Sequence, residues 1–230
     1  MPDLLMTGVK PDASATQKTY LMLRRLIVTG ELKPGEKLKI DALRQRLDVG
    51  ASPIREALSL LTSDNLVERI DQRGFRAATI SHANFEEILR LRCDLEDQAL
   101  RRSIARRTQD WEEALVLCHH RMAREQGRGG EAFEDLHKAF HMALLDNCAS
   151  PILLRFCSQL YDLNIRYRYI AGRSLDYTKR DVSKEHEGIM YAAIAGEEDL
   201  ASERLLDHYR KTGAFLAAYF KKADLSAVTL

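Results

Sequence analysis

The chain has 230 residues, of which 45% are hydrophobic and 30% charged, and its formal net charge is +1. This length allows two modest domains with a core each, and the near-neutral charge excludes a protein that binds nucleic acid through overall basicity. Residues 1–80 carry 13 Lys and Arg against 10 Asp and Glu. Any nucleic-acid function must therefore rest on a local basic patch, for which the first third of the chain is the better candidate.

Four cysteines lie in helical patterns and show no CxxC spacing: Cys93, Cys118, Cys148 and Cys157. This usage is typical of reduced thiols in a cytoplasmic protein. No apolar run approaches the roughly 18–20 residues that a bilayer span requires, and the N-terminus lacks a basic and then apolar leader. We therefore expect a cytoplasmic protein with no membrane partner.

The first 15 residues contain two prolines and small polar residues and are expected to form a disordered arm. An amphipathic helix then runs from Thr16 to Gly30, and a turn over residues 33–37 follows it. A second, short helix is predicted from Asp41, as its N-cap, to Leu47. A third helix is predicted to begin with Ser52 as its N-cap and Pro53 in its first turn.

The third helix has an apolar stripe, which leaves a short polar face with Arg55 on it. Two strands are predicted next, over residues 66–70 and 75–80, and Gly74 closes the turn between them. A helix followed by a hairpin with a basic tip is typical of a winged helix-turn-helix, which we place at residues 16–80. The third helix could then enter the DNA major groove, and Arg73 would meet the phosphates or the minor groove. The alternative is an ordinary helix and hairpin packed in a core.

After residue 80 only helical patterns follow, at residues 81–107, 108–126, 131–147, 151–170, 183–196 and 197–222, with a flexible break at 127–130. We expect Ser81, Thr108 and Ser183 to cap three of these helices. Residues 81–230 are therefore predicted to form a six-helix antiparallel bundle. The fold class is mainly α, with an N-terminal winged helix-turn-helix domain.

Two histidines, His137 and His141, share the apolar stripe of their helix and lie one turn apart. Side chains at this spacing can bind one divalent metal ion together. His186 and His208 also fall on the inward faces of their helices. A single core histidine is usually satisfied by a hydrogen bond, but four of them in one bundle predict a metal site, with Zn²⁺ or Ni²⁺ preferred by neutral imidazoles.

Arg92 occupies an otherwise apolar inward face, and a buried guanidinium needs an anion. One alternative is a salt bridge to Glu96. The other is that Arg92 holds the carboxylate of a small molecule that also binds the metal. Asn164 and Arg166, on the helix of residues 151–170, could line the same cavity, although packing alone would also explain them.

The order of these motifs resembles the GntR family of bacterial transcription regulators, and within it the FadR subfamily and its VanR-like group with an FCD domain. The segments that carry the resemblance are Lys33–Gly35, Ser52–Leu58, Asn65–Val67, Gln72–Phe75, Leu91–Glu96, Phe140–His141, Glu185–His186 and His208. A weaker match, Arg166–Ile170, resembles the glutarate-responsive branch. The resemblance implies a homodimer that binds a double-stranded DNA operator. It also implies a helical domain for dimerisation that binds a small carboxylic acid, often at a metal, and thereby changes the operator affinity.

In the DNA-binding domain the resemblance assigns DNA contacts to Ser52, Arg55, Arg73 and Gly74. Two departures affect DNA reading. The family usually has Ser-Arg where this chain has Gly-Ala at residues 50–51, and an acidic Asp41 stands where an arginine often contacts DNA. We expect Arg44 or Arg46 to compensate, and the operator to differ from the family's usual one.

In the helical domain the resemblance assigns metal binding to His141, His186 and His208, whereas His137 replaces the usual aspartate. An imidazole in place of a carboxylate keeps a ligand and raises the charge of the site by one, which favours an anionic effector.

The sequence thus predicts a ligand-responsive regulator, most simply a repressor, that is not an enzyme. A metal-dependent hydrolase is the alternative, but residues 138–140 between the paired histidines are Lys, Ala and Phe, so the general-base glutamate of an HExxH motif is absent. A constitutive DNA-binding protein with a purely structural bundle is the third alternative.

Overall fold

The computed structural model describes residues 14–70, 73–125, 131–171 and 181–222. These residues form two compact units, one with residues 14–81 and 165–170 and the other with residues 82–164 and 171–222. Most of the expected N-terminal arm, part of the wing turn and the break at 127–130 lie outside the described residues. Within the described ranges, no helix combines the length and apolarity needed to cross a membrane.

The first unit is built on three helices, α1 (Ala15–Val28), α2 (Ile40–Leu47) and α3 (Ala51–Ser63). The helix α1 starts where the side chain of Ser14 accepts a hydrogen bond from the amide of Gln17 at 3.1 Å. The apolar stripes of α1 and α3 pack against each other and form the core of this unit, with fully buried Leu23, Ile27, Ile54, Leu58 and Leu61. Amphipathic periodicity therefore explains the pairing of the two helices.

A small antiparallel sheet completes the first unit, with β1 (Lys37–Leu38), β2 (Val67–Ile70) and β3 (Gly74–Ala77) in the order β1-β3-β2. Glu68 lies opposite Arg76 in the ladder and accepts a hydrogen bond from its Nε at 2.7 Å. At the tip of the hairpin Gly74 has a φ of +92°, which favours glycine because it lacks a Cβ atom. These elements confirm the predicted winged helix-turn-helix.

Two predicted helix caps in this unit are wrong. The N-cap residue of α3 is Gly50, where the backbone is extended, and the helix begins at Ala51. Ser52 therefore lies inside the first turn and is not the cap. Pro53 is tolerated further into the first turn, where the backbone N–H groups have no helical partner. Lys39, rather than Asp41, is the N-cap residue of α2.

Six α-helices follow the first unit along the described chain: α4 (His82–Ala105), α5 (Gln109–Glu125), α6 (Glu131–Leu145), α7 (Pro151–Ala171), α8 (Val182–Ala195) and α9 (Glu198–Lys222). They make up the second unit, except that residues 165–170 of α7 group with the first. A short 3₁₀ helix, Asp146–Cys148, follows α6. Thr108 caps α5 as predicted, since its Oγ1 accepts a hydrogen bond from the amide of Trp111 at 3.3 Å. The cap of α8 is Asp181 and not Ser183, because the Asp181 carboxylate accepts the amide of Lys184 at 3.1 Å.

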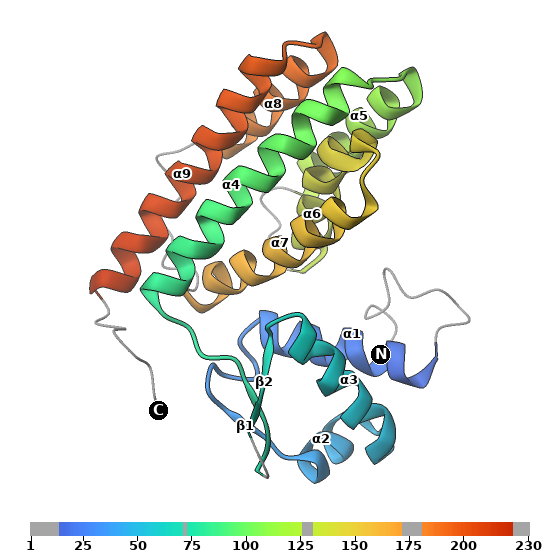
Figure 1. The fold of residues 1–230 in the computed structure, drawn as a ribbon, viewed down its shortest axis with the longest axis vertical. Coiled ribbons are helices and arrows are strands. Elements are labelled where there is room, and N and C mark those ends of the chain that lie inside the picture. Colours follow the sequence, from blue (N-terminus) through green and yellow to red (C-terminus); the bar gives the residue numbers. More distant parts are fainter. Residues whose placement is uncertain (1–13, 71–72, 126–130, 172–180, 223–230) are drawn as a thin grey trace. The chain divides into compact units, whose positions relative to one another are not determined.

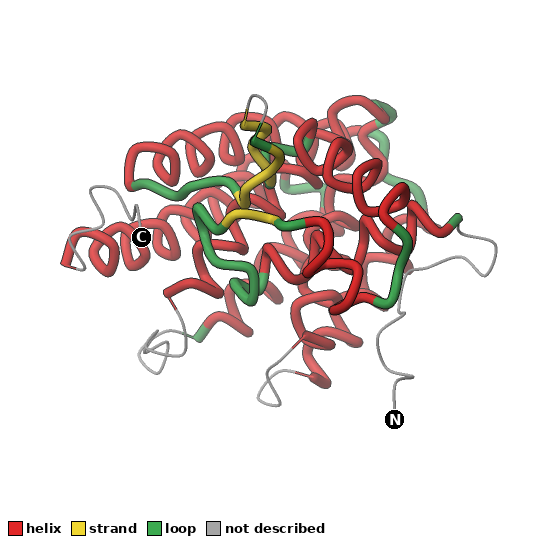
Figure 2. Tube along the Cα trace, turned by 90° about the horizontal axis from the view of Figure 1, so that it is seen from below, coloured by secondary structure: helices red, strands yellow, loops and turns green. Residues whose placement is uncertain are grey.

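The helices α4 and α9 lie side by side along much of their length (Figure 1). At Gly213 of α9 a Cβ atom would lie 2.2 Å from Cδ2 of Leu89 on α4, so a larger residue at this position would force the Leu89 side chain to shift. The helix α5 packs against α6 and α8, and the shared core includes buried Leu100, Leu115, Phe140, Ile189 and Leu205. Figure 2 shows that most of the described chain is helical. The predicted mainly α fold class is therefore confirmed.

Candidate metal centre and nucleic-acid interface

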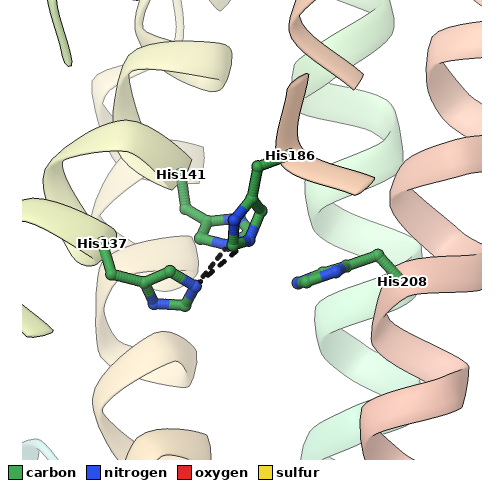
Figure 3. Close-up of side chains that lie close together, drawn as sticks. All are labelled: His137, His141, His186 and His208. Carbon is green, nitrogen blue, oxygen red and sulfur yellow. Dashed lines mark hydrogen bonds between the residues drawn. The ribbon is translucent and has the colours of Figure 1, made fainter. Parts of the chain in front are cut away.

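Four buried histidines from three helices of the second unit converge on one point (Figure 3). His137 and His141 come from α6, His186 from α8 and His208 from α9, and each side chain is at most 6% exposed. One ligand nitrogen from each residue lies within 4.8 Å of the other three. The predicted cluster of histidines is therefore present in the fold.

The spacing of the nitrogens fits a metal ion. Nε2 of His137 lies 3.2 Å from Nε2 of His141 and 3.3 Å from Nε2 of His186. Four nitrogens arranged tetrahedrally at the usual zinc distance would be about 3.3 Å apart. The ring of His208 lies beside that of His186, with the two ring centroids 4.6 Å apart. Since the four ligand nitrogens all lie within 4.8 Å of one another, small side-chain movements would bring them into coordination distance.

Three of the histidines also contact polar groups through Nδ1, on the side of the ring away from the cluster. Nδ1 of His208 lies 2.8 Å from Oε2 of Glu185, Nδ1 of His141 lies 3.0 Å from the hydroxyl of Tyr209, and Nδ1 of His137 lies 2.5 Å from the hydroxyl of Tyr161. Partners at Nδ1 orient an imidazole so that Nε2 can serve as the ligand.

Burial lowers the pKa of His141 well below its ordinary value, and the neighbouring His137 and His186 lower it further. This imidazole is therefore neutral at pH 7, which is the form that binds metal ions.

Arg92 lies beside the cluster on α4 and is 5% exposed. Its Nε donates to Oε1 of Glu96 at 2.6 Å, and its Nη1 donates to Oδ1 of Asn164 at 3.0 Å. Burial is the largest single influence on the pKa of the guanidinium and lowers it, but the combined effects of Glu96, Tyr209 and Tyr161 outweigh burial and raise the pKa above its ordinary value. The salt bridge to Glu96, one of the two alternatives for Arg92, is therefore present.

The structure joins Asn164 to Arg92 but does not bring Arg166 to the same place. Arg166 groups with the first unit, where its Nη2 donates to the carbonyl oxygen of Ala78 at 2.6 Å. Burial lowers its pKa to about 10. Arg166 is thus held within the first unit by Ala78, and its role as an effector-binding residue stays a prediction.

On the first unit, the predicted DNA-contacting residues lie on the surface, and they differ in how they are paired. Arg55 and Arg73 are exposed, and neither forms an ion pair with another described residue. Arg44 lies 3.4 Å from Asp41, and Arg46 lies 2.5 Å from Glu31. Surface pairs of this kind contribute at most about 1 kcal/mol, so phosphate groups can compete for both arginines.

The hydroxyl of Ser52 donates to Oε1 of Glu56 at 3.0 Å, and Oε2 of the same carboxylate accepts from Thr16 at 2.6 Å. Glu56 therefore connects the start of α1 to the first turn of α3. The Ser52 hydroxyl has its proton committed to Glu56, which leaves its lone pairs to accept from a partner.

Sequence reasoning assigned no role at the histidines to two polar residues, namely Glu185 and Tyr209. Both are direct neighbours of predicted ligands in the chain, since Glu185 precedes His186 and Tyr209 follows His208. Each contacts a histidine other than its own neighbour, a relationship that depends on the packing of helices.

The fold defines a class, the transcription regulators with an N-terminal winged helix and a C-terminal helical domain. Residues 15–76 match the gntR family of bacterial regulatory proteins, and residues 87–211 match the FCD domain. The chain therefore belongs to the gntR family of regulators with an FCD domain. The expected regulator, and not the hydrolase, is confirmed, because the relatives described below are all transcription regulators.

Two curated relatives share about a third of their residues with this chain. The uncharacterized HTH-type transcriptional regulator BphR of Paraburkholderia xenovorans is 33% identical over 202 residues, which cover 85% of this chain and 82% of BphR. The HTH-type transcriptional repressor GlaR of Escherichia coli is 32% identical over 198 residues, which cover 82% of this chain and 90% of GlaR. Among solved structures, E. coli McbR/YncC matches with a TM-score of 0.80 at 21% identity, over 90% of this chain and 99% of McbR, which supports the fold.

Proposed function

We propose that this protein is a ligand-responsive repressor that binds an operator as a homodimer and senses a small carboxylic acid at a metal ion in its helical domain. The observation that carries the sensing part is the convergence of four buried histidine nitrogens within 4.8 Å. Because its target would be chromosomal operator DNA, we place the protein in the bacterial cytoplasm.

The DNA-binding part rests on the exposed Arg55 of α3 and on the exposed Arg73 of the wing. An arginine on a recognition helix can bind a guanine with two hydrogen bonds in the major groove. Gly74 would let the wing approach the DNA backbone, and Arg44 and Arg46 would bind phosphates. A dimer presents two such heads and would recognise two half-sites of an inverted repeat. GlaR is named a transcriptional repressor, which supports the proposal that this protein also represses transcription.

The metal part rests on the chemistry of the donors. His137, His141, His186 and His208 would hold Zn²⁺ or Ni²⁺, both of which suit imidazole ligands. When bound, the metal would supply a Lewis acid that attracts the oxygens of an anionic ligand. Four neutral imidazoles leave the full charge of +2 on the ion, so the site favours a carboxylate more strongly than one with an acidic ligand would.

The effector part concerns Arg92 and Asn164. The guanidinium of Arg92 already binds Glu96, so an effector carboxylate at Arg92 would compete with this internal carboxylate. Competition of this kind raises the selectivity among carboxylic acids. Only an acid that also binds the metal would gain enough binding free energy to displace Glu96 from Arg92. Binding would stabilise one arrangement of the bundle and thereby change the fit of the two DNA-binding heads to their half-sites.

The proposal is tested with the purified protein in three steps. Elemental analysis should find one Zn²⁺ or Ni²⁺ per chain, and light scattering should give the mass of a dimer. Titration with the intergenic DNA beside the gene for this protein should then show saturable binding that an unrelated DNA of equal length does not compete away. A metal-free native protein would overturn the metal site, and the absence of specific DNA binding would overturn the regulator.

A further inference from the structure

The hydroxyl of Tyr209 joins a candidate metal ligand to the buried ion pair on α4. It lies 3.0 Å from Nδ1 of His141 and donates a hydrogen bond to Oε2 of Glu96. Glu96 in turn binds Arg92. All four side chains are buried, with exposures of at most 5%, so water cannot easily take the place of any member of this chain.

The direction of each hydrogen bond follows from the ion pair of Glu96 and Arg92, at the end of the chain of contacts that is farthest from His141. Glu96 is the partner of a guanidinium, and an ionised carboxylate can only accept hydrogen bonds. A phenol has one proton, and Tyr209 donates it to Glu96. The oxygen of Tyr209 can therefore only accept at its contact with His141, which requires a proton on Nδ1 of that imidazole.

We infer that Tyr209 and the Glu96–Arg92 pair hold His141 in the tautomer with the proton on Nδ1, so that the lone pair of Nε2 is directed into the histidine cluster before any metal arrives. Tyr209 is thus a positioning residue for the metal site. The inference rests on the proposed function, since it assigns a purpose to the tautomer only if the cluster binds metal.

Two comparisons within the cluster support this assignment. His208 has the same arrangement in a shorter form, because its Nδ1 faces the carboxylate of Glu185 directly. Nε2 of His141 lies 3.2 Å from Nε2 of His137, which places the directed lone pair at the point where the ligand nitrogens meet. Fixing the tautomer in advance removes a rearrangement that metal binding would otherwise require.

The ring of Tyr209 has a second role that must be separated from that of the hydroxyl. It packs under Arg92, with the guanidinium carbon 4.2 Å from the ring centroid. Tyr209→Phe keeps the ring and this cation–π contact and removes only the hydroxyl. The matched control is Tyr191→Phe, which removes the hydroxyl of a tyrosine on α8 that is 59% exposed.

The first measurement is the affinity for Zn²⁺ and for Ni²⁺, obtained by competition with a chelator of known affinity. We expect Tyr209→Phe to bind metal 10- to 100-fold more weakly than the wild type, the usual effect of losing an outer partner of a ligand. Tyr191→Phe should bind like the wild type. A wild-type affinity in Tyr209→Phe would overturn the inference.

The second measurement is the ¹⁵N NMR spectrum of the histidine rings in metal-free protein, with His141 assigned by its loss in His141→Gln. The wild type should show the Nδ1–H tautomer at His141, and Tyr209→Phe should show a mixture. A general loss of packing would not produce this change at one imidazole. An Nε2–H tautomer at His141 in the wild type would overturn the role inferred for Tyr209, even if the metal site exists. A wild type that takes up no metal would overturn the proposed metal site itself.

Discussion

The carboxylate of Glu185 on α8 lies 2.8 Å from Nδ1 of His208 on α9. Glu185 therefore supports a ligand on the neighbouring helix, while the next residue in the chain, His186, is itself a candidate ligand. A carboxylate at Nδ1 makes the opposite nitrogen a better donor to a metal ion. One turn of α8 thus contributes to two of the four candidate ligands.

Replacing this carboxylate by an amide tests its contribution. We expect Glu185→Gln to lower the affinity for Zn²⁺ about 10- to 100-fold, because a neutral amide polarises His208 less. Isothermal titration of metal-free protein measures the affinity. The control is Glu187→Gln on the exposed side of the same helix. Equal affinities for both variants would show that Glu185 has no part in the site.

Removing a central ligand should have a larger effect. We expect His141→Ala to lose stoichiometric metal, and metal to raise the midpoint of thermal unfolding of the wild type but not of the variant. A chelator should lower the midpoint of the metal-loaded wild type to that of the metal-free protein. His120→Ala, at an exposed position on α5, is the control. Unchanged metal content in His141→Ala would refute the four-histidine site.

The recognition helix makes a prediction that is independent of the metal. Arg55→Ala should weaken binding to the specific operator by about 1–3 kcal/mol and leave the free energy of unfolding nearly unchanged, because the side chain is exposed. Arg124→Ala on α5 removes an equal charge from an exposed position of the helical domain and should not alter binding. Intact operator affinity in Arg55→Ala would remove Arg55 from the DNA interface.

A buried thiol predicts the dependence of stability on alkaline pH. Burial, with a contribution from Glu96, raises the pKa of Cys157 to about 12. Between the ordinary pKa and this value the unfolded chain loses the thiol proton and the folded chain keeps it, so stability falls as the pH rises, by at most about 1.4 kcal/mol per pH unit.

Denaturant unfolding between pH 8 and 10 measures this effect. The variant Cys157→Ala should show a shallower decline with pH than the wild type, whatever its stability at pH 8. Parallel declines in the two proteins would show that Cys157 is not protected from ionisation.

Sequence periodicity predicted most of the fold, because apolar stripes identify helices and turn residues separate them. It placed His137 and His141 on one face of one helix, which local geometry alone determines. The caps were less predictable. Ser52 and Ser183 are good N-cap residues, but the helices start earlier, at Gly50 and Asp181, since tertiary packing decides where the extended chain ends.

The surroundings of the histidines could not be predicted, because they depend on how helices meet. The contact between His141 and Tyr209 joins residues 68 positions apart, and a one-residue rotation of α9 would abolish it. The hydrogen bond from Arg166 to the carbonyl oxygen of Ala78 was unpredictable for a similar reason, since it joins residues 88 positions apart.

The central claim is that the histidine cluster senses an acid and thereby controls DNA binding. The most direct measurement is the operator affinity of metal-loaded wild type and of His141→Ala, with and without a panel of dicarboxylic and aromatic acids. We predict that one acid changes the affinity of the wild type at least tenfold and leaves that of His141→Ala unchanged. An unchanged operator affinity with every acid of the panel, or an equal response in both proteins, would contradict the claim.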